Sequence, residues 1–401
     1  MSVVWVSSLR QVARCASIVL LASWLGAAAH AQARTCTGYS WSDWDEFVTR
    51  FVQDDGRVID ASTPEKLTTS EGQSYGMFFA LVANDRPTFD RLWRWSLENL
   101  ASGLPAGERL AAWSWGLRGD GTWGVLDENA ASDADLWYVY TLLEAGRLWR
   151  NAAYTRDALA LLAHVREQEI AELPGFGVML LPAPYGFVQP DGVWRLNPSY
   201  LPVPVLRRLA QADPTGPWVA LAAHTVQMIQ ATTPRGFAAD WVAYRAIPGS
   251  VPENGGFDLD TVYGARGSYD AIRTYLWAGM TPVSDSAAQP LMNALFGMAD
   301  AVALQGLPPE FVQIDTGESQ GVGPVGFSAA LLPYLKARGL TTLLADQLQR
   351  VRRALAPDAI QTQSVRYYDF VLSLFGLGWF EQRYEFADSG RLRLDWEKKC
   401  P

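Results

Sequence analysis

Apolar side chains recur along most of this chain with a period close to 3.6 residues, which is typical of helices packed against a core. Gly, Pro and Asp turns interrupt this pattern. The chain has no alternating strand pattern of useful length and no long linker rich in Pro, Gly or Ser. The pattern predicts twelve helices, at residues 40–52, 70–83, 88–101, 133–149, 154–170, 198–211, 214–230, 268–280, 286–303, 324–337, 340–355 and 366–378.

Every second predicted helix is the more apolar of its pair. Residues 77–82 and 370–375 are nearly apolar all round, as expected of helices buried on every side. The odd-numbered helices carry a charged face, as in Arg91, Arg94 and Glu98. The connections into even-numbered helices are often long, whereas those into odd-numbered helices are short. This asymmetry favours an all-α fold, an (α/α)6 barrel of six helical hairpins with the even-numbered helices inside.

Carboxyl groups stand at the starts of three of these inner helices. Glu71, Asp133 and Asp270 each lie beside Gly, Ser or Tyr, and Tyr200 occupies the corresponding place in the sixth helix. If neighbouring helices are antiparallel, all four residues meet at one rim, where they suggest an acid–base site that needs no metal or cofactor. A structural explanation stays open, because acids in a first helical turn are favoured by the helix dipole. Two segments also fit a capping box, Thr68-x-x-Glu71 and Ser70-x-x-Gln73.

Two other motifs match the sequence without the context that they need. Residues 72–76 fit the G-x-S-x-G nucleophile elbow, but no strand precedes them, and His164 and His224 both fall within predicted helices. Residues 321–326 fit a dinucleotide fingerprint, but Pro324 interrupts it and no βαβ unit surrounds it. Few histidines and no metal-spaced cysteine cluster argue against a zinc site.

The first 33 residues have the pattern of an export signal. Arg10 and Arg14 precede an apolar stretch at 16–25, and small residues permit cleavage after Ala31 or Ala33. We expect residues 34–401 to form one domain in the periplasm or outside the cell. Removing the signal takes away two arginines, which changes the net charge from −9 to −11. An acidic surface without a long apolar span argues against nucleic acid and membrane insertion as partners, and it tolerates a neutral polysaccharide.

Two cysteines remain at opposite ends of the mature chain, Cys36 and Cys400. In an oxidising compartment they can form a disulfide that ties the termini together. The alternative is a pair of unrelated thiols.

Six segments resemble glycoside hydrolase family 8, and more closely its periplasmic endoglucanases that are encoded with bacterial cellulose synthase. They occur in the family's order at residues 55–60, 68–84, 131–137, 197–200, 268–273 and 323–330. The resemblance implies an (α/α)6-barrel catalytic domain and an endo-β-1,4-glucanase that inverts the anomeric carbon. It implies a β-1,4-glucan chain as substrate, and the cellulose synthase machinery as a further partner.

The resemblance also assigns roles to individual residues. Glu71 matches the proton donor, Asp270 the general base, and Asp133 the acid that holds the sugar at the cleavage point. Residues that orient the base, its water or the sugar are matched by Tyr200, Tyr269 and Arg273. Asp135 fits the same motif as Asp133 without a clear role.

An endo-acting enzyme needs sugar platforms along an open groove. Trp113, Trp115, Trp123 and Trp194 lie in the long connections, where each either stacks on a sugar or folds into the rim. Three hypotheses therefore stand: an endoglucanase serving cellulose production, a family-8 hydrolase of chitosan, xylan or mixed-linkage glucan, and a non-catalytic glucan-binding protein. The paired acids Glu71 and Asp270 argue against the third.

Overall fold

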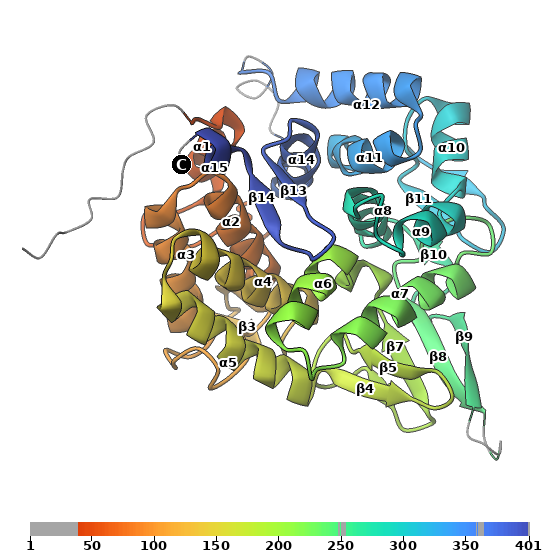
Figure 1. Cartoon of the computed structure of the whole chain (residues 1–401), viewed down its shortest axis with the longest axis horizontal. Coiled ribbons are helices and arrows are strands. Elements are labelled where there is room, and N and C mark those ends of the chain that lie inside the picture. The colour runs from red at the N-terminus through yellow and green to blue at the C-terminus, as the bar shows by residue number, and fades with distance from the viewer. Residues whose placement is uncertain (1–38, 248, 250–253, 358, 360–364, 400–401) are drawn as a thin grey trace, which may run out of the picture. The chain divides into compact units, whose positions relative to one another are not determined.

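Six helices form an inner ring in a computed structural model that describes residues 39–247, 249, 254–357, 359 and 365–399 (Figure 1). They are α2 (Ser70–Val82), α4 (Ser132–Leu148), α6 (Val203–Ala212), α8 (Ala271–Met280), α11 (Val325–Ala337) and α14 (Tyr367–Phe380). Each packs against the next in this order. Phe79 of α2 and Phe375 of α14 close the ring, because their ring centroids lie 4.6 Å apart.

A second set of helices lies outside this ring and precedes or connects its members. These helices are α1 (Ser42–Phe51), α3 (Arg86–Asn99), α5 (Ala152–Gln168), α7 (Trp218–Thr232), α9 (Ala288–Ala294), α10 (Gly297–Gln305) and α12 (Thr341–Ala354). Helix α12, for example, covers α11 on its outer side (Figure 1). The predicted barrel of helical hairpins is confirmed.

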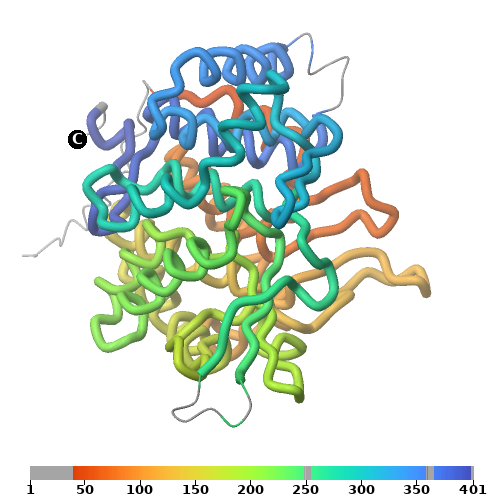
Figure 2. The backbone as a smooth tube through the Cα atoms, turned by 90° about the vertical axis from the view of Figure 1, so that its right-hand side faces the viewer, coloured from red at the N-terminus to blue at the C-terminus, as the bar shows by residue number. Residues whose placement is uncertain are grey.

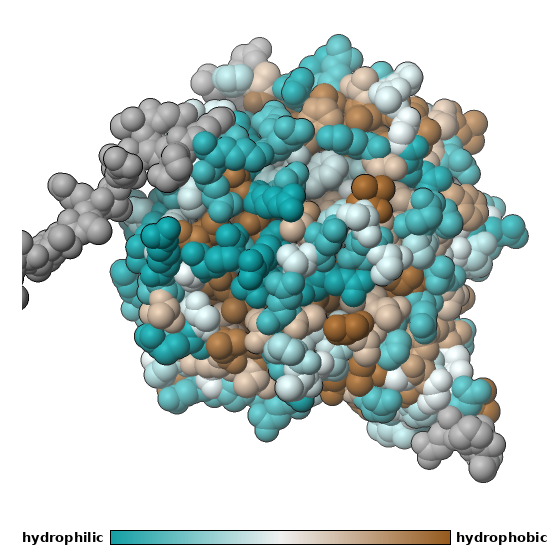
Figure 3. Space-filling view, viewed as in Figure 1, coloured by the Kyte–Doolittle hydropathy of each residue, from teal (hydrophilic) through white to brown (hydrophobic). Residues whose placement is uncertain are grey.

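The inner and outer helices differ in burial as the apolar pattern predicted. In α2 every residue except Glu71 is buried, whereas α12 buries only Gln347 and Val351. The face shown in Figure 3 is covered mainly by hydrophilic side chains, with apolar ones scattered among them. Burial of the inner helices on all sides leaves their ends as the places where polar groups can gather.

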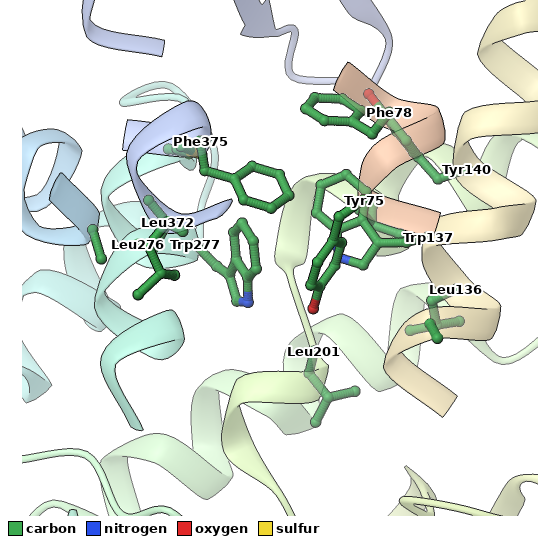
Figure 4. Packing of buried hydrophobic residues seen from close by; sticks show 14 of the residues in the cluster. Tyr75, Phe78, Leu136, Trp137, Tyr140, Leu201, Leu276, Trp277, Leu372 and Phe375 are labelled. Carbon is green, nitrogen blue, oxygen red and sulfur yellow. The ribbon is translucent and has the colours of Figure 1, made fainter. Parts of the chain in front are cut away.

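Aromatic side chains from four inner helices fill the centre of the ring. Trp137 of α4 lies with its ring centroid 5.0 Å from Phe78 of α2, and 5.4 Å from both Trp277 of α8 and Phe375 of α14. Figure 4 shows these rings pointing toward one another, with Tyr75 beside them. Edge-to-face and tilted ring packing at such distances stabilises the core beyond simple area burial, so the helix starts above it are held rigidly.

Short antiparallel strands form in the connections between helices and after α14, where the sequence shows no alternating pattern of useful length. They are β1 (Thr68–Thr69), β2 (Ser114–Leu117), β3 (Trp123–Asp127), β4 (Ile170–Leu173), β5 (Gly177–Leu180), β6 (Val188–Gln189), β7 (Val193–Leu196), β8 (Val242–Ile247), β9 (Asn254–Leu259), β10 (Arg266–Gly267), β11 (Phe311–Gln313), β12 (Ser319–Gln320), β13 (Tyr384–Phe386) and β14 (Leu392–Leu394). Most of these strands span four residues or fewer, which is too short for a period of two to be evident, and the longer strands β8 and β9 do not alternate apolar and polar residues. The hairpin of β2 and β3 projects on the same side as residues 53–67 (Figure 2).

Two predicted helices are interrupted. The segment 198–211 begins as a 3-10 turn, η1 (Pro198–Tyr200), and α6 starts only after Pro202. The segment 286–303 divides into α9 and α10. A short terminal helix, α15 (Asp395–Lys399), was not predicted.

The expected signal at residues 1–33, Cys36 and Cys400 all lie outside the described residues. Within the described part of the chain, no helix is both long and apolar enough to cross a membrane.

Candidate active site

Arg273 brings the starts of two inner helices together at one rim. Its Nη2 atom lies 3.1 Å from Oδ1 of Asp270, which precedes α8, and 3.7 Å from Oδ2 of Asp133 on α4. The guanidinium carbon lies 5.8 Å from the ring centroid of Tyr200 in η1. Glu71 of α2 is close enough for the charge of Asp133 to raise its pKa. The predicted convergence of these helix starts is therefore confirmed.

A hollow of about 400 Å³ opens beside the general-base candidate Asp270. It is lined by Asp60, Ser62, Tyr269, Asp270, Arg273, Pro324, Arg366, Tyr368 and Asp369. Acidic and basic side chains are mixed along this lining, with hydroxyl groups between them. Such a surface can hydrogen-bond the hydroxyl groups of a neutral sugar.

The first turn of α2 is fixed around Glu71. The helix is capped by Thr69, whose Oγ1 accepts a hydrogen bond of 3.0 Å from the amide of Gly72, so neither predicted capping box is the one used. Gly72 is required, because a side chain there would collide with the hydroxyl of Tyr367. Ser70 Oγ donates weakly to Glu71 Oε2 over 3.4 Å.

Burial raises the pKa of Glu71 to about 8, and the charge of Asp133 adds to this effect. At neutral pH Glu71 therefore holds a proton that it can donate. This is the state that a general acid requires.

Asp133 is enclosed at the base of the site. Its Oδ1 accepts from the amide of Ala134 over 2.8 Å, and its Oδ2 accepts from the hydroxyl of Tyr75 over 3.3 Å. Burial raises its pKa to about 6, an effect that the positive charge of Arg273 opposes. Above that pH Asp133 is an anion held rigidly by these contacts.

Asp270 presents a carboxylate held by two donors. Arg273 meets Oδ1, and the indole Nε1 of Trp241 donates to Oδ2 over 3.0 Å. Although Asp270 occupies the capping position of α8, its side chain makes no capping bond. The carboxylate is therefore free to act at the hollow that it lines.

Tyr200 and Tyr269, which were both predicted to bind substrate, lie in different surroundings. Tyr200 packs near Trp241, with ring centroids 6.1 Å apart. Burial raises the pKa of its hydroxyl well above the ordinary value, and the charges of Asp133, Glu71 and Asp270 add to this effect. Tyr269 lines the hollow, but its hydroxyl donates to Glu310 over 2.7 Å, while its carbonyl accepts from Tyr368. The sequence analysis missed Tyr368, which also accepts from Arg273 over 3.2 Å.

Only two of the four predicted tryptophan platforms lie together. Trp115 and Trp123 are stacked, with ring centroids 5.5 Å apart and planes at 18°, and Trp123 is 45% exposed. Arg57 lies over both rings. Strand β2 pairs Trp115 with Thr68, which places this stack beside the start of α2.

The other two tryptophans pack more into the protein. Trp194 lies edge-on to Tyr244 across the β7–β8 pair, and Trp113 is half-buried against the core. The carbonyl of Trp113 accepts from the amide of Ser70, so its backbone supports the start of α2. Trp241 also lies in a long connection, between α7 and β8, but it was not among the four predicted platforms.

Asp135 is a second acid in the first turn of α4. It is buried beside the carboxyl of Glu169, at the end of α5, and burial raises the pKa of both groups well above the ordinary range. Within the described residues no group of three or more His, Cys, Asp or Glu side chains is arranged to hold a metal ion.

Comparison with known proteins finds the same family over most of the chain. The model of glycosyl hydrolases family 8 matches residues 12–382. The endoglucanase of Pseudomonas fluorescens (strain SBW25) is 46% identical over 383 residues, which cover 92% of this chain and 94% of that protein. The endoglucanase of Escherichia coli (strain K12) is 42% identical over 361 residues, which cover 90% and 93%.

A solved structure agrees in fold over nearly the same length. The endo-1,4-D-glucanase from Vibrio fischeri ES114 has a TM-score of 0.83 and 38% identity, and the match covers 89% of this chain and 100% of that one. The chain therefore belongs to glycosyl hydrolases family 8 and is an inverting glycoside hydrolase.

Proposed function

We propose that this enzyme is an endo-β-1,4-glucanase in which Glu71 is the general acid and Asp270 the general base. The observation that carries the proposal is the contrast between two carboxyls at one rim. Glu71 keeps its proton through burial and the nearby charge of Asp133, whereas Asp270 is held by the cation Arg273 and the indole N–H of Trp241. Two carboxyl groups with such different surroundings suit the two roles of general acid, which donates a proton, and general base, which accepts one.

In the proposed reaction Glu71 gives its proton to the oxygen of the leaving sugar. Asp270 takes a proton from a water molecule, which attacks the anomeric carbon from the opposite face of the ring. That water needs room, so we expect the two carboxyls to stand roughly 6.5–9.5 Å apart. The attack inverts the anomeric carbon, and proton NMR should therefore detect the α-anomer first.

Asp133 is proposed to stabilise the sugar at the cleavage point. As the ring approaches the oxocarbenium-like state, an anion held by Tyr75 and Arg273 interacts with the growing positive charge more strongly than with the ground state. Trp123 and Trp115 are proposed to hold a more distant sugar of the chain by stacking, because Trp123 is half-exposed beside the start of α2.

A neutral glucan suits the site better than cationic chitosan. The carboxylates Asp60, Asp270 and Asp369 line the hollow, but Arg273 and Arg366 line it as well. The endoglucanases to which the chain is similar support the same choice. The export-signal pattern of residues 1–33 supports action in the periplasm or outside the cell, and we propose cellulose production as its setting.

Release of reducing ends tests the proposal. Carboxymethyl cellulose, chitosan and xylan are offered to the wild type, to Glu71→Gln and to Asp270→Asn. We expect activity on the cellulose derivative and a loss of at least a hundredfold in each variant, since general acid or base catalysis contributes about 10²–10⁴-fold.

Exposed acids on outer helices provide matched controls, Glu98→Gln on α3 and Asp300→Asn on α10. These variants should keep wild-type activity. Full cellulase activity in either site variant would refute the roles assigned to Glu71 and Asp270. A clear preference of the wild type for chitosan or xylan would refute cellulose as the substrate.

A further inference from the structure

Trp241 directs its side-chain hydrogen-bond donor, the indole N–H, at the carboxylate proposed as general base. The Nε1 atom lies 3.0 Å from Oδ2 of Asp270, while Arg273 occupies Oδ1 at 3.1 Å. Two donors on different oxygens fix the rotation of a carboxylate and leave its remaining lone pairs for water. An N–H group directed at a carboxylate also favours the charged form of that acid.

The indole ring is itself held in place by neighbours. Phe187 stacks on it with ring centroids 5.6 Å apart and planes at 7°. The guanidinium of Arg195 lies 5.2 Å from the ring centroid, and Asp260 anchors it through contacts of 2.7 and 3.1 Å. Trp241 is also partly buried, whereas Trp123 is 45% exposed.

The preceding residue, Asp240, acts on the backbone of the same segment. Its buried Oδ1 accepts from the amides of Ser268, Asp270 and Ala271 over 2.7, 3.1 and 2.9 Å. The amides of Asp270 and Ala271 are orphan amides at the start of α8, which the side chain of Asp270 does not cap, and the amide of Ser268 lies in the turn that leads into the helix. Asp240 therefore supplies the cap from outside the helix, and the carboxyl of Asp270 is released from that task.

We infer that Asp240 and Trp241 form one positioning unit for the general base, in which Asp240 fixes the main chain of Asp270 and Trp241 orients and stabilises its carboxylate. This inference rests on the proposed role of Asp270. Both residues act through their contacts with Asp270, so they are positioning residues. Because they are adjacent in sequence and precede β8, any shift of that strand would move both contacts together.

Several other charged or titratable groups also interact with Asp270 and belong to the same electrostatic balance. They are Arg273 on α8, Asp133 on α4, Tyr200 in η1, Tyr368 on α14 and Asp240 itself. None of these groups is altered by a substitution at Trp241, so such a variant isolates the contribution of the N–H group.

The decisive variant is Trp241→Phe, which keeps an aromatic ring and removes the donor. We expect kcat to fall roughly tenfold to a hundredfold, the range of one hydrogen bond to a charged group, with little change in KM. This split between kcat and KM distinguishes the loss of a positioning contact from a general loss of folding or of substrate binding.

Trp93→Phe is the matched control, because the indole of Trp93 also donates to a carboxylate, Oδ2 of Asp157 over 3.2 Å, between the outer helices α3 and α5. It should keep the wild-type kcat, and thermal melting should show both variants folded. A wild-type kcat in folded Trp241→Phe would overturn the inference. So would an equal loss of kcat in Trp93→Phe.

Asp240 is tested through rescue by a conservative variant. Asp240→Asn keeps an acceptor oxygen for the three amides, whereas Asp240→Ala removes it, so kcat should fall further in the alanine variant. Equal kcat values in the two variants would overturn the role of the cap. Asp270→Asn distinguishes failure of the proposed function from failure of the positioning unit. If Asp270→Asn is active, the proposed function fails. If it is inactive while Trp241→Phe is unaffected, only the positioning unit fails.

Discussion

Nη2 of Arg273 lies 3.7 Å from Oδ2 of Asp133, which joins the first turn of α8 to the first turn of α4. The same nitrogen contacts Asp270, so one cation serves two carboxylates with different proposed tasks. The side chain of Arg273 is only 11% exposed, and so these interactions are poorly screened by water. Its positive charge opposes the rise in the pKa of Asp133 that burial causes.

Replacing Arg273 by Met should damage both stability and catalysis. We expect the free energy of unfolding to fall by about 3 kcal/mol, because removing one partner leaves buried carboxylates uncompensated. The pKa of Asp133 should rise, so the activity that remains should require a higher pH. Urea unfolding and a pH–rate profile measure the two effects.

The control is Arg207→Met, which breaks the ion pair of Arg207 with Asp285 beyond the far end of α8. It should lower stability by a similar amount without moving the pH profile. If the two variants have the same profile, Arg273 does not set the charge of the site.

The proton on Glu71 determines the alkaline limit of the reaction. Glu71 acts when protonated, so kcat/KM should fall as the pH rises through its pKa of about 8. The charge of Asp133 helps to keep that proton in place, and Asp133→Asn should therefore lower the pKa of Glu71. The alkaline limb of the weak remaining activity should move to lower pH.

Asp369→Asn is the comparison for this limb, since Asp369 lines the hollow but bonds to the backbone of Gly326. The alkaline limb of the kcat/KM profile of Asp369→Asn should coincide with that of the wild type. If the alkaline limb of Asp133→Asn also coincides with that of the wild type, Asp133 does not help to hold the proton on Glu71.

The buried pair of Asp135 and Glu169 should make the enzyme less stable at high pH. Burial raises the pKa of both carboxyls in the folded state, so the folded protein binds more protons than the unfolded chain. Their stabilising contribution is therefore complete below the ordinary pKa, near 4, and is lost as the pH rises through the raised values. The free energy of unfolding should decline over that range.

The double variant Asp135→Asn with Glu169→Gln should flatten this decline in urea unfolding at several pH values. Glu167→Gln, on the exposed face of the same helix α5, should retain the wild-type slope. Parallel slopes in the double variant and the wild type would mean that this pair does not ionise on unfolding.

The sequence predicted those features that depend on helical periodicity. An apolar surface all round α2 and α14 distinguished the inner helices, and antiparallel hairpins then required Glu71, Asp133 and Asp270 to share a rim. Strands such as β1 and β10 span two residues each, so no periodicity could reveal them.

Contacts between distant loops could not be predicted from the sequence for a different reason. The cap of α8 comes from Asp240, which no local capping rule can assign because it lies outside the helix segment. Trp241 was visible as a loop tryptophan, but only the tertiary structure shows that its N–H group meets Asp270 rather than a sugar or the core.

The division of labour between Glu71 and Asp270 is tested most directly by a substrate whose leaving group needs no proton. A cellooligosaccharide carrying a 2,4-dinitrophenolate leaving group is compared with the unmodified oligosaccharide in Glu71→Gln and Asp270→Asn. We predict that Glu71→Gln recovers a rate close to that of the wild type on the activated substrate, whereas Asp270→Asn stays slow on both. Equal loss in both variants on the activated substrate, or recovery by Asp270→Asn alone, would contradict the account.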